Sequence, residues 1–291
     1  MAPSTSAQWL LIFVTLLWGS TFLTLQTSLQ WADPLVVVCL RFCLATLILL
    51  ALLRGRIRQI SLYEWKAGFC VGLCIFGVYT LQTIGLGSIA SSTSAFLTDL
   101  YIGFVPLLQW LFLKQTPSMS VVITTFMAFC GMGFFANPFA MDFSGQIGEW
   151  VTVLSALICA VEILTVSHFA PGCRPLYLSF TQMVSVAVLA ILALCLHEPV
   201  RPTQWTLGLG ACVTALAAIV AFVQFGIGWA LKYISAIRAT LIYALEPVFA
   251  GIIGWCAGER LGLNEWIGAA LIIAAVLLSA FRPKKARSKR S

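Results

Sequence analysis

Long stretches of apolar residues with almost no charge run through the whole of this chain. Each is about 20 residues long, which at about 1.5 Å per residue is the length that a helix needs to cross a hydrocarbon core of about 30 Å. A strand of a membrane barrel would be about half as long and would alternate apolar with polar residues. Only 9% of the 291 residues are charged, whereas about 25% are charged in a soluble domain. The pattern therefore predicts an all-α integral membrane protein.

Ten such stretches can be delimited, and they leave little chain for a soluble domain. They comprise residues 8–29, 35–53, 67–86, 93–113, 119–137, 147–167, 176–196, 206–231, 236–257 and 263–281. No Lys or Arg precedes the first stretch, which is also longer than the apolar core of a cleaved signal peptide. We therefore expect it to remain in the protein as the first of ten transmembrane helices.

The basic residues accumulate on one side of the expected bundle. If the N-terminus is cytoplasmic, fourteen of the 17 Lys and Arg residues fall on the cytoplasmic side, two fall outside, and Arg41 lies within a span. Because Lys and Arg in short loops stay in the cytoplasm, both termini are predicted to be cytoplasmic, in an inner or plasma membrane. The basic tail, residues 282–291, is interpreted as an orientation signal or an anionic-lipid contact rather than a nucleic-acid arm.

The two halves of the chain resemble each other at a shift of 141 residues. The shift superimposes Pro106 on Pro247 and also matches further Pro, Trp and Gly residues. Each half carries five of the expected spans, and because five is odd the second half must cross the membrane in the opposite sense. We therefore expect two inverted five-helix repeats, residues 1–137 and 138–291, an architecture of many secondary transporters.

Two segments carry a family pattern: TSAFLTDLYIGFVPLLQ, and ISAIRATLIYALEPVFAGIIGWCAGERLGLNEWIGAALIIAAVLLSA in the second half. They resemble the paired signature of the drug/metabolite transporter superfamily, EamA type, and the similarity extends over residues 8–281. The first half departs from the family pattern at Lys114, where a glutamate is usual. The resemblance implies ten helices around a central cavity that opens alternately to each side, and export of amino acids or other small metabolites.

Four charged residues lie in the interior of the apolar stretches, away from their ends: Arg41, Asp99, Glu162 and Glu246. A charge at the centre of a membrane helix costs roughly 2.5 to 3.5 kcal/mol, so such residues point to a functional site. None recurs at the repeat shift, where Gln182 stands opposite Arg41. One arginine cannot neutralise three acids. Arg41 either pairs with one of them or is free for a substrate, and the other acids are protonated, hydrated or paired with an arriving cation.

Aromatic and amide side chains share helix faces with these charges at spacings of three and four residues. Buried amides in particular need hydrogen-bond partners that hydrocarbon lacks. The candidate substrate-binding residues are Trp18, Thr21, Phe22, Arg41, Tyr79, Gln82, Phe96, Asp99, Glu162, Gln224, Tyr243 and Glu246. Pro106 and Pro247 are candidate hinges, because inverted-repeat transporters interrupt helices at such places; the alternative is that these prolines only kink their helices.

No enzyme, cofactor or metal site is predicted. The two cysteine pairs that share a helix face have no histidine beside them, which disfavours a zinc site. The two histidines fall in loops assigned to opposite sides of the membrane, which disfavours an intramembrane hydrolase.

The sequence favours a secondary transporter that exports small organic metabolites, amino-acid-like or cationic, by alternating access. One alternative is an antiporter or importer of phosphorylated or nucleotide-linked sugars, which Arg41 as the single intramembrane cation disfavours. Another is a receptor or accessory protein without flux, which the repeat disfavours. The expected partners are a small-molecule substrate and the lipid bilayer, with no nucleic acid. Proton coupling is left open, as is the choice between a monomer and a homodimer.

Overall fold

The protein is described from a computed structural model, which covers residues 3–89, 91–114, 116–136, 145–196, 202–256 and 262–280. Within these ranges the regular structure is helical, as the apolar stretches predicted. The elements are α1 (Pro3–Gly19), α2 (Thr21–Ser28), α3 (Pro34–Leu53), η1 (Arg56–Gln59), α4 (Leu62–Leu86), α5 (Ser91–Asp99), α6 (Tyr101–Leu113), α7 (Met119–Ala136), α8 (Ile147–Phe169), η2 (Ala170–Gly172), α9 (Pro175–Leu196), α10 (Leu207–Ala230), α11 (Ala236–Tyr243), α12 (Glu246–Cys256) and α13 (Leu263–Ala280).

Seven helical segments in the described part are long and apolar enough to cross a membrane: Pro3–Ser28, Pro34–Leu53, Leu62–Leu86, Thr93–Phe112, Ile147–Gly172, Pro175–Leu196 and Leu207–Ala230. Two shorter apolar helices, Met119–Phe134 and Leu263–Ser279, coincide with the fifth and tenth expected spans. The ninth expected span corresponds to α11 and α12, which are separate helices. The chain is therefore a multi-pass membrane protein, and the count of ten spans in two inverted repeats stays a prediction.

Local sequence accounts for where several helices begin. Asp33 caps α3 by accepting a hydrogen bond from the backbone N–H of Leu35, and Pro34 occupies the first helical position, which suits its fixed φ. Ser61 and Glu64 form a capping box at the start of α4, each side chain bonding the other's backbone N–H. These caps satisfy backbone donors that would otherwise be unpaired at helix starts.

Three of the expected spans are interrupted. The turn between α1 and α2 falls at Ser20, that between α5 and α6 at Leu100, and that between α11 and α12 at Ala244 and Leu245. Pro247 lies in the first turn of α12, immediately after its break, whereas Pro106 lies inside α6. The interruption of the fourth span therefore precedes Pro106 by six residues instead of coinciding with it.

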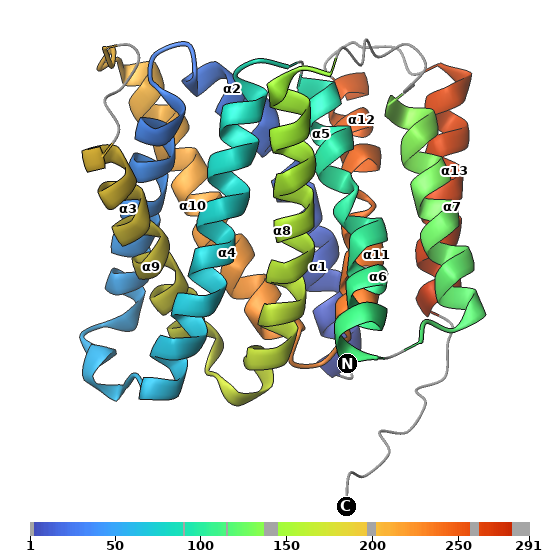
Figure 1. Ribbon diagram of the computed structural model, residues 1–291, viewed down its shortest axis with the longest axis horizontal. Helices are drawn as coiled ribbons and strands as arrows, with labels where there is room; N and C mark the ends of the chain where they lie inside the picture. The colour runs from blue at the N-terminus through green and yellow to red at the C-terminus, as the bar shows by residue number, and fades with distance from the viewer. Residues whose placement is uncertain are drawn as a thin grey trace, which may run out of the picture.

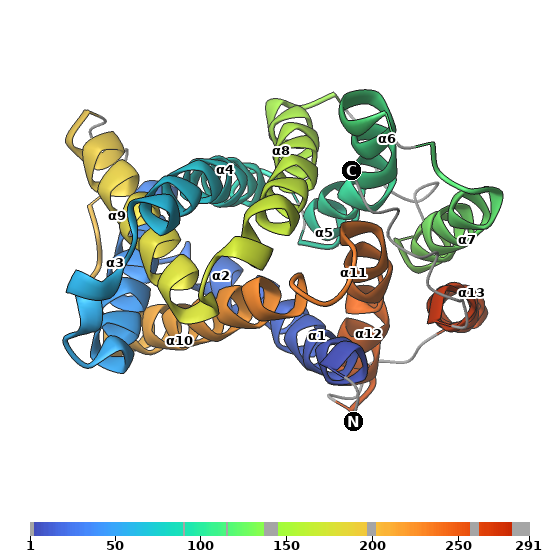
Figure 2. The same cartoon turned by 90° about the horizontal axis from the view of Figure 1, so that it is seen from below.

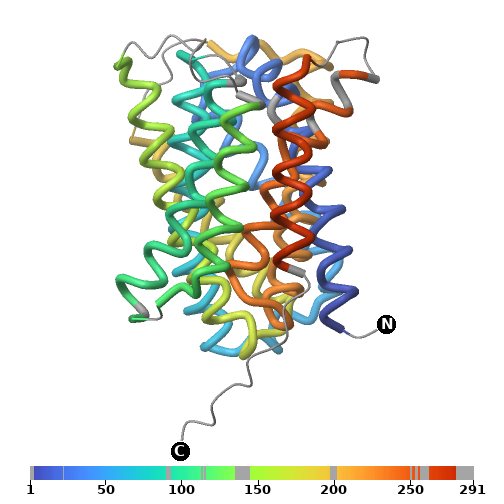
Figure 3. Tube along the Cα trace, turned by 90° about the vertical axis from the view of Figure 1, so that its right-hand side faces the viewer, coloured from blue at the N-terminus to red at the C-terminus, as the bar shows by residue number. Residues whose placement is uncertain are grey.

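Helix α4 is central to the packing, because it contacts both α8 and α9 extensively, and Figure 2 shows it between them. Glycines make the close approach possible: a Cβ on Gly68 would overlap Thr181 of α9, and a Cβ on Gly85 would overlap Thr152 of α8. Small residues serve this purpose in membrane helices, where lipid competes with apolar packing. At one edge of the bundle α7 packs along α13 (Figures 1 and 3).

The outer surface of the bundle is apolar. Large side chains such as Phe126, Leu196 and Trp150 are exposed on it. Exposed apolar side chains on this scale are unusual in a soluble monomer. They fit a surface that lipid covers.

The N-terminal end of α1 and the C-terminal end of α13 lie on the same side of the bundle. Helix α1 begins and α13 ends at the lower end of Figure 1, where the connections between α3 and α4 and between α8 and α9 also lie. These connections carry Arg54, Arg56, Arg58 and Arg174. The arrangement agrees with the predicted clustering of basic loops on one side, while the assignment of that side to the cytoplasm stays a prediction.

A reporter experiment tests this orientation. Green fluorescent protein fused after Ser291 is expected to fluoresce, and alkaline phosphatase inserted in the connection between α7 and α8, near residue 145, is expected to be active outside. The reason is that basic loops are retained in the cytoplasm. The reversed reporter pattern would contradict the orientation, and both reporters on one side would contradict the odd number of spans per half.

Candidate functional site

The four charged residues predicted inside the membrane are all buried, and they come from four helices. Arg41 lies in α3, Asp99 ends α5, Glu162 lies in α8 and Glu246 begins α12. No ion pair joins any of them to an oppositely charged group in the described ranges. Of the alternatives that the sequence left open, a pairing of Arg41 with an acid is therefore not found among the described residues.

The three acids gather around one part of α8. Cys159, one turn before Glu162, interacts electrostatically with Glu162, Glu246 and Asp99. Asp99 and Glu246 also interact electrostatically with each other, and Tyr101 interacts electrostatically with both. Neither Asp99 nor Glu246 has a hydrogen-bonded side-chain partner among the residues that the structure describes. The helices thus place three acids around Cys159, and no basic side chain of the described residues pairs with any of them.

Two of these acids stand at helix interruptions. Asp99 is the last residue of α5, directly before the turn at Leu100, and Glu246 is the first residue of α12, directly after the turn at Ala244 and Leu245. In many transporters, substrate and ion sites lie where membrane helices are discontinuous. The interruptions therefore mark the same place as the acids.

A chain of amides leads to the third acid. Gln182 of α9 donates from Nε2 to Oε1 of Gln224 in α10 at 3.2 Å, and Gln224 donates from Nε2 to Oε1 of Glu162 at 3.2 Å. The Oε1 atom of Gln182 is buried without a partner. Gln224 was predicted as a site residue, whereas Gln182 was noted only as the repeat counterpart of Arg41. The same reasoning about buried amides would have identified Gln182.

Arg41 is held by aromatic rings. Its guanidinium carbon lies 4.7 Å from the centre of the Tyr79 ring and 5.7 Å from that of Phe42, and the two rings meet edge to face. The Nε atom of Arg41 is buried and has no hydrogen-bond partner. Tyr79 also interacts electrostatically with Glu162 and Glu246, so it is close to two of the acids as well as to the arginine.

Other predicted residues form contacts within the bundle. Gln82 donates to Oγ1 of Thr98 at 3.2 Å and so links α4 to α5. Trp18 packs edge to face on Tyr243, with ring centres 5.8 Å apart, and the Tyr243 hydroxyl is buried without a partner. Thr21 donates to the backbone carbonyl of Trp18 at 2.8 Å, across the turn between α1 and α2.

Two aromatic candidates and the two prolines gain less support. Phe96 is only partly buried, against the core, and the side chain of Phe22 lies outside the described part. The hinge roles of Pro106 and Pro247 stay predictions. Geometrically, only Pro247 adjoins an interruption.

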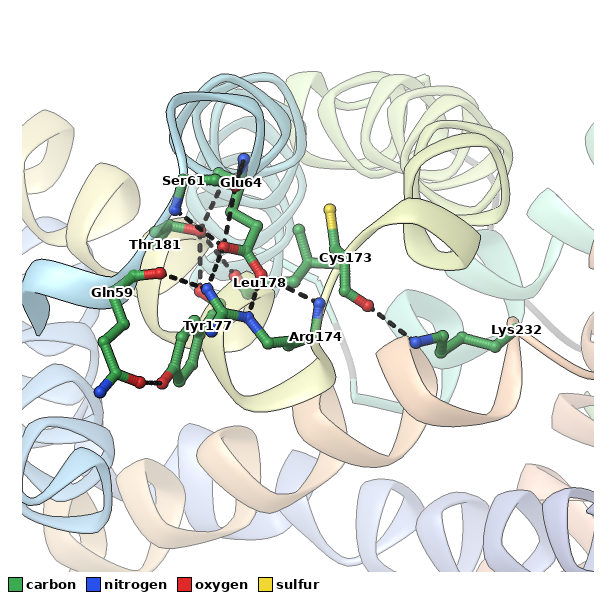
Figure 4. A network of polar contacts seen from close by, with 9 residues as sticks. All are labelled: Gln59, Ser61, Glu64, Cys173, Arg174, Tyr177, Leu178, Thr181 and Lys232. Atoms are coloured by element: carbon green, nitrogen blue, oxygen red, sulfur yellow. Dashed lines mark hydrogen bonds and ion pairs between the residues drawn. The ribbon is translucent and has the colours of Figure 1, made fainter. Parts of the chain in front are cut away.

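The sequence did not predict a second polar cluster, at the end of the bundle where α4 and α9 begin (Figure 4). Arg174 donates from Nε to Oε1 of Glu64 at 2.9 Å and from Nη2 to Oε2 at 2.7 Å. Its backbone N–H bonds the same carboxylate, and Nη2 also donates to the carbonyl of Gln59. The guanidinium carbon of Arg174 lies 3.6 Å from the centre of the Tyr177 ring. We call this group the Glu64–Arg174 cluster.

The Glu64–Arg174 cluster joins the two halves of the chain. Thr181 of the second half donates to the backbone carbonyl of Glu64 in the first half at 3.0 Å. Within the second half, Lys232 donates to the carbonyl of Cys173 at 2.8 Å. The Glu64 carboxylate raises the pKa of the Arg174 guanidinium above its usual value. Because Glu64 and Arg174 are 110 residues apart in the sequence, no local pattern reveals the pair.

Comparison with known proteins identifies the family. The model of the EamA-like transporter family matches residues 5–136 and again residues 146–281. The chain belongs to the EamA-like transporter family. It is therefore a member of the drug/metabolite transporter superfamily, as the resemblance of the two signature segments implied.

Relatives of similar length support the assignment of this protein to the EamA-like transporter family. An uncharacterized transporter of Archaeoglobus fulgidus is 29% identical over 94% of this chain and 85% of its own length. The uncharacterized transporter YvbV of Bacillus subtilis is 26% identical over 95% and 92%. One solved crystal structure shares the fold, with a TM-score of 0.75 and 18% identity over 94% of this chain and 96% of its own. The family and these relatives support a transporter role in a membrane.

Proposed function

We propose that this EamA-like protein is a secondary transporter that exports small organic metabolites, amino-acid-like or cationic, by alternating access. The observation that carries the proposal is the group of three acids, Asp99, Glu162 and Glu246, for which the described part supplies no protein cation. Uncompensated acids inside a membrane protein are expensive, and they are retained where a cation or a proton arrives. A positively charged substrate meets this requirement.

The interrupted helices supply the proposed movement. Asp99 and Glu246 each adjoin a turn that divides a membrane segment into two helices, so a rotation at either turn changes the position of one acid relative to the other. A substrate bound between them would favour whichever facing state improves both contacts. The site would then open to one side of the membrane at a time, and a proton could compete with the substrate for the same carboxylates.

The transport of phosphorylated or nucleotide-linked sugars is the weaker proposal. A phosphate group needs several nearby cations, and among the described residues Arg41 is the only basic one in the interior of a membrane segment rather than at its end. The three acids would repel such a substrate. A receptor without flux is a further alternative, which the family assignment makes less favourable.

Transport by purified protein in lipid vesicles tests the proposal. Radiolabelled amino acids and organic cations are offered to vesicles that are either empty or preloaded with the same unlabelled compound. Uptake is expected to be higher in the preloaded vesicles, because the transporter can exchange labelled molecules outside for unlabelled molecules inside. Sugar phosphates and nucleotide sugars, offered in parallel, are expected to give no uptake. Flux confined to the phosphorylated compounds would establish the sugar alternative, and monodisperse protein that moves neither class would favour the receptor.

A further inference from the structure

Arg41 is a buried cation that forms no ion pair with the residues that the structure describes. The residue is 3% exposed, its Nε has no hydrogen-bond partner, and no carboxylate in the described ranges lies within ion-pair distance. A guanidinium carries five N–H donors in a rigid fork. Burying one without an acceptor is costly, so the site is incomplete as it stands.

A second arginine of the same protein provides the comparison. Arg174 also lies over a tyrosine ring, but its fork is occupied by both oxygens of Glu64. Arg41 has the same kind of aromatic support, from Tyr79, without the carboxylate. The aromatic platform orients the fork in both places, and at Arg41 the described residues supply no carboxylate acceptor.

The missing acceptor can belong to the same molecule that the acids bind. The guanidinium of Arg41 stacks on the Tyr79 ring, and Tyr79 also interacts electrostatically with Glu162 and Glu246, so one side chain is close to both the arginine and these two acids. A small molecule with an anionic end and a cationic end would satisfy both. A carboxylate fits the fork with two parallel hydrogen bonds, whereas a doubly charged phosphate would leave an excess negative charge next to the acids.

We infer that Arg41 binds the carboxylate of a zwitterionic substrate and thereby selects zwitterions over simple cations. The inference rests on the proposed function, since it assigns the selectivity of the same site. Arg41 is then a specificity-determining residue, and Tyr79 is the positioning residue that presents its fork. The acids bind the positive end of either kind of molecule, so they do not make this distinction.

Matched ligand pairs test the inference. The binding of L-leucine and L-phenylalanine is compared with that of their decarboxylated amines, isoamylamine and phenethylamine, by thermal shift and by competition for uptake. Wild-type protein is expected to prefer the amino acid of each pair. In Arg41→Gln the preference is expected to fall by about 10- to 100-fold, because a charge-assisted pair of hydrogen bonds is lost. Arg58→Gln, which removes an exposed arginine, is expected to change nothing.

The outcomes separate the inference from the proposed function. Wild-type protein that binds neither the amino acids nor the amines contradicts the proposed substrate class. Wild-type protein that binds each amine as well as its amino acid, or an Arg41→Gln variant that weakens both alike, overturns the role of Arg41 while leaving transport intact. If Arg41→Gln does not fold, Arg41→Lys decides: it keeps the charge but loses the fork, and an undiminished preference for amino acids would overturn the inference. Inorganic phosphate is expected to give no thermal shift. A shift that phosphate causes in the wild type but not in Arg41→Gln would show that Arg41 binds phosphate, which would overturn the assignment to a carboxylate.

Discussion

Arg174→Gln is expected to lower the free energy of unfolding of the protein in detergent by about 2 kcal/mol. The substitution removes two charge-assisted hydrogen bonds to Glu64, whose side chain is 3% exposed, while the Arg174 side chain is 50% exposed. The loss should therefore fall between the about 0 to 1 kcal/mol of an exposed pair and the about 3 to 5 kcal/mol of a buried pair broken on one side. Thermal and denaturant-induced unfolding of the monodisperse protein measure it.

Controls separate the pair from a general loss of charge. Arg58→Gln should leave the unfolding temperature unchanged, because Arg58 is exposed. Glu64→Gln combined with Arg174→Gln should cost less than the sum of the single substitutions, since the two side chains interact directly. Strict additivity, together with an unchanged unfolding temperature for Arg174→Gln, would show that the pair contributes nothing.

Cys173 provides a local measurement of the same effect. Its side chain is 2% exposed, and burial raises the pKa of its thiol to about 11, so little reactive thiolate is present at neutral pH. Alkylation of Cys173, followed by peptide mass spectrometry, should be slow in the wild type. It should accelerate in Arg174→Gln if the neighbouring connection between α8 and α9 loosens.

The sequence predicted the helical class because the solvent dictates it. Backbone groups in a hydrocarbon layer must bond within their own segment, so runs of about 20 apolar residues become helices whatever their detailed sequence. The positions of the interruptions were harder to predict. Pro106 lies inside α6 although it lacks a donor, and the chain turns instead at Leu100, which no residue-level signal marks. Tertiary packing of α5 and α6 against α8 competes with the local preference there.

Individual intramembrane charges were identified from sequence, but their partners were not. Burial of Arg41 and Glu162 follows from their apolar surroundings, whereas the absence of an ion pair between them depends on how α3 and α8 are placed in space. For the Glu64–Arg174 cluster, neither the residues nor their pairing was predicted from the sequence. Both residues stand near helix ends, where charges are ordinary, and only the packing of α4 against α9 brings them together.

Glu246→Gln is expected to reduce transport of a positively charged substrate by about 30- to 1,000-fold, the loss associated with truncating one partner of a buried charge pair. The carboxylate begins α12 directly after the helix interruption and interacts with Asp99. An amide keeps the size of the side chain but cannot attract an ammonium group or take up a proton. Uptake into vesicles, measured over a range of pH, should therefore lose both its rate and the part of its pH dependence that Glu246 contributes.

A matched carboxylate serves as the control for this substitution. Glu265→Gln changes an acid in the first turn of α13 and should leave the rate and the pH profile unaltered. Thermal unfolding of each variant separates a loss of transport from a loss of folding. If Glu246→Gln folds and retains the wild-type rate at every pH, then Glu246 binds neither substrate nor proton during transport. Asp99 or Glu162 would then carry the positive end of the substrate, because these two acids remain without a protein cation in the described part of the bundle.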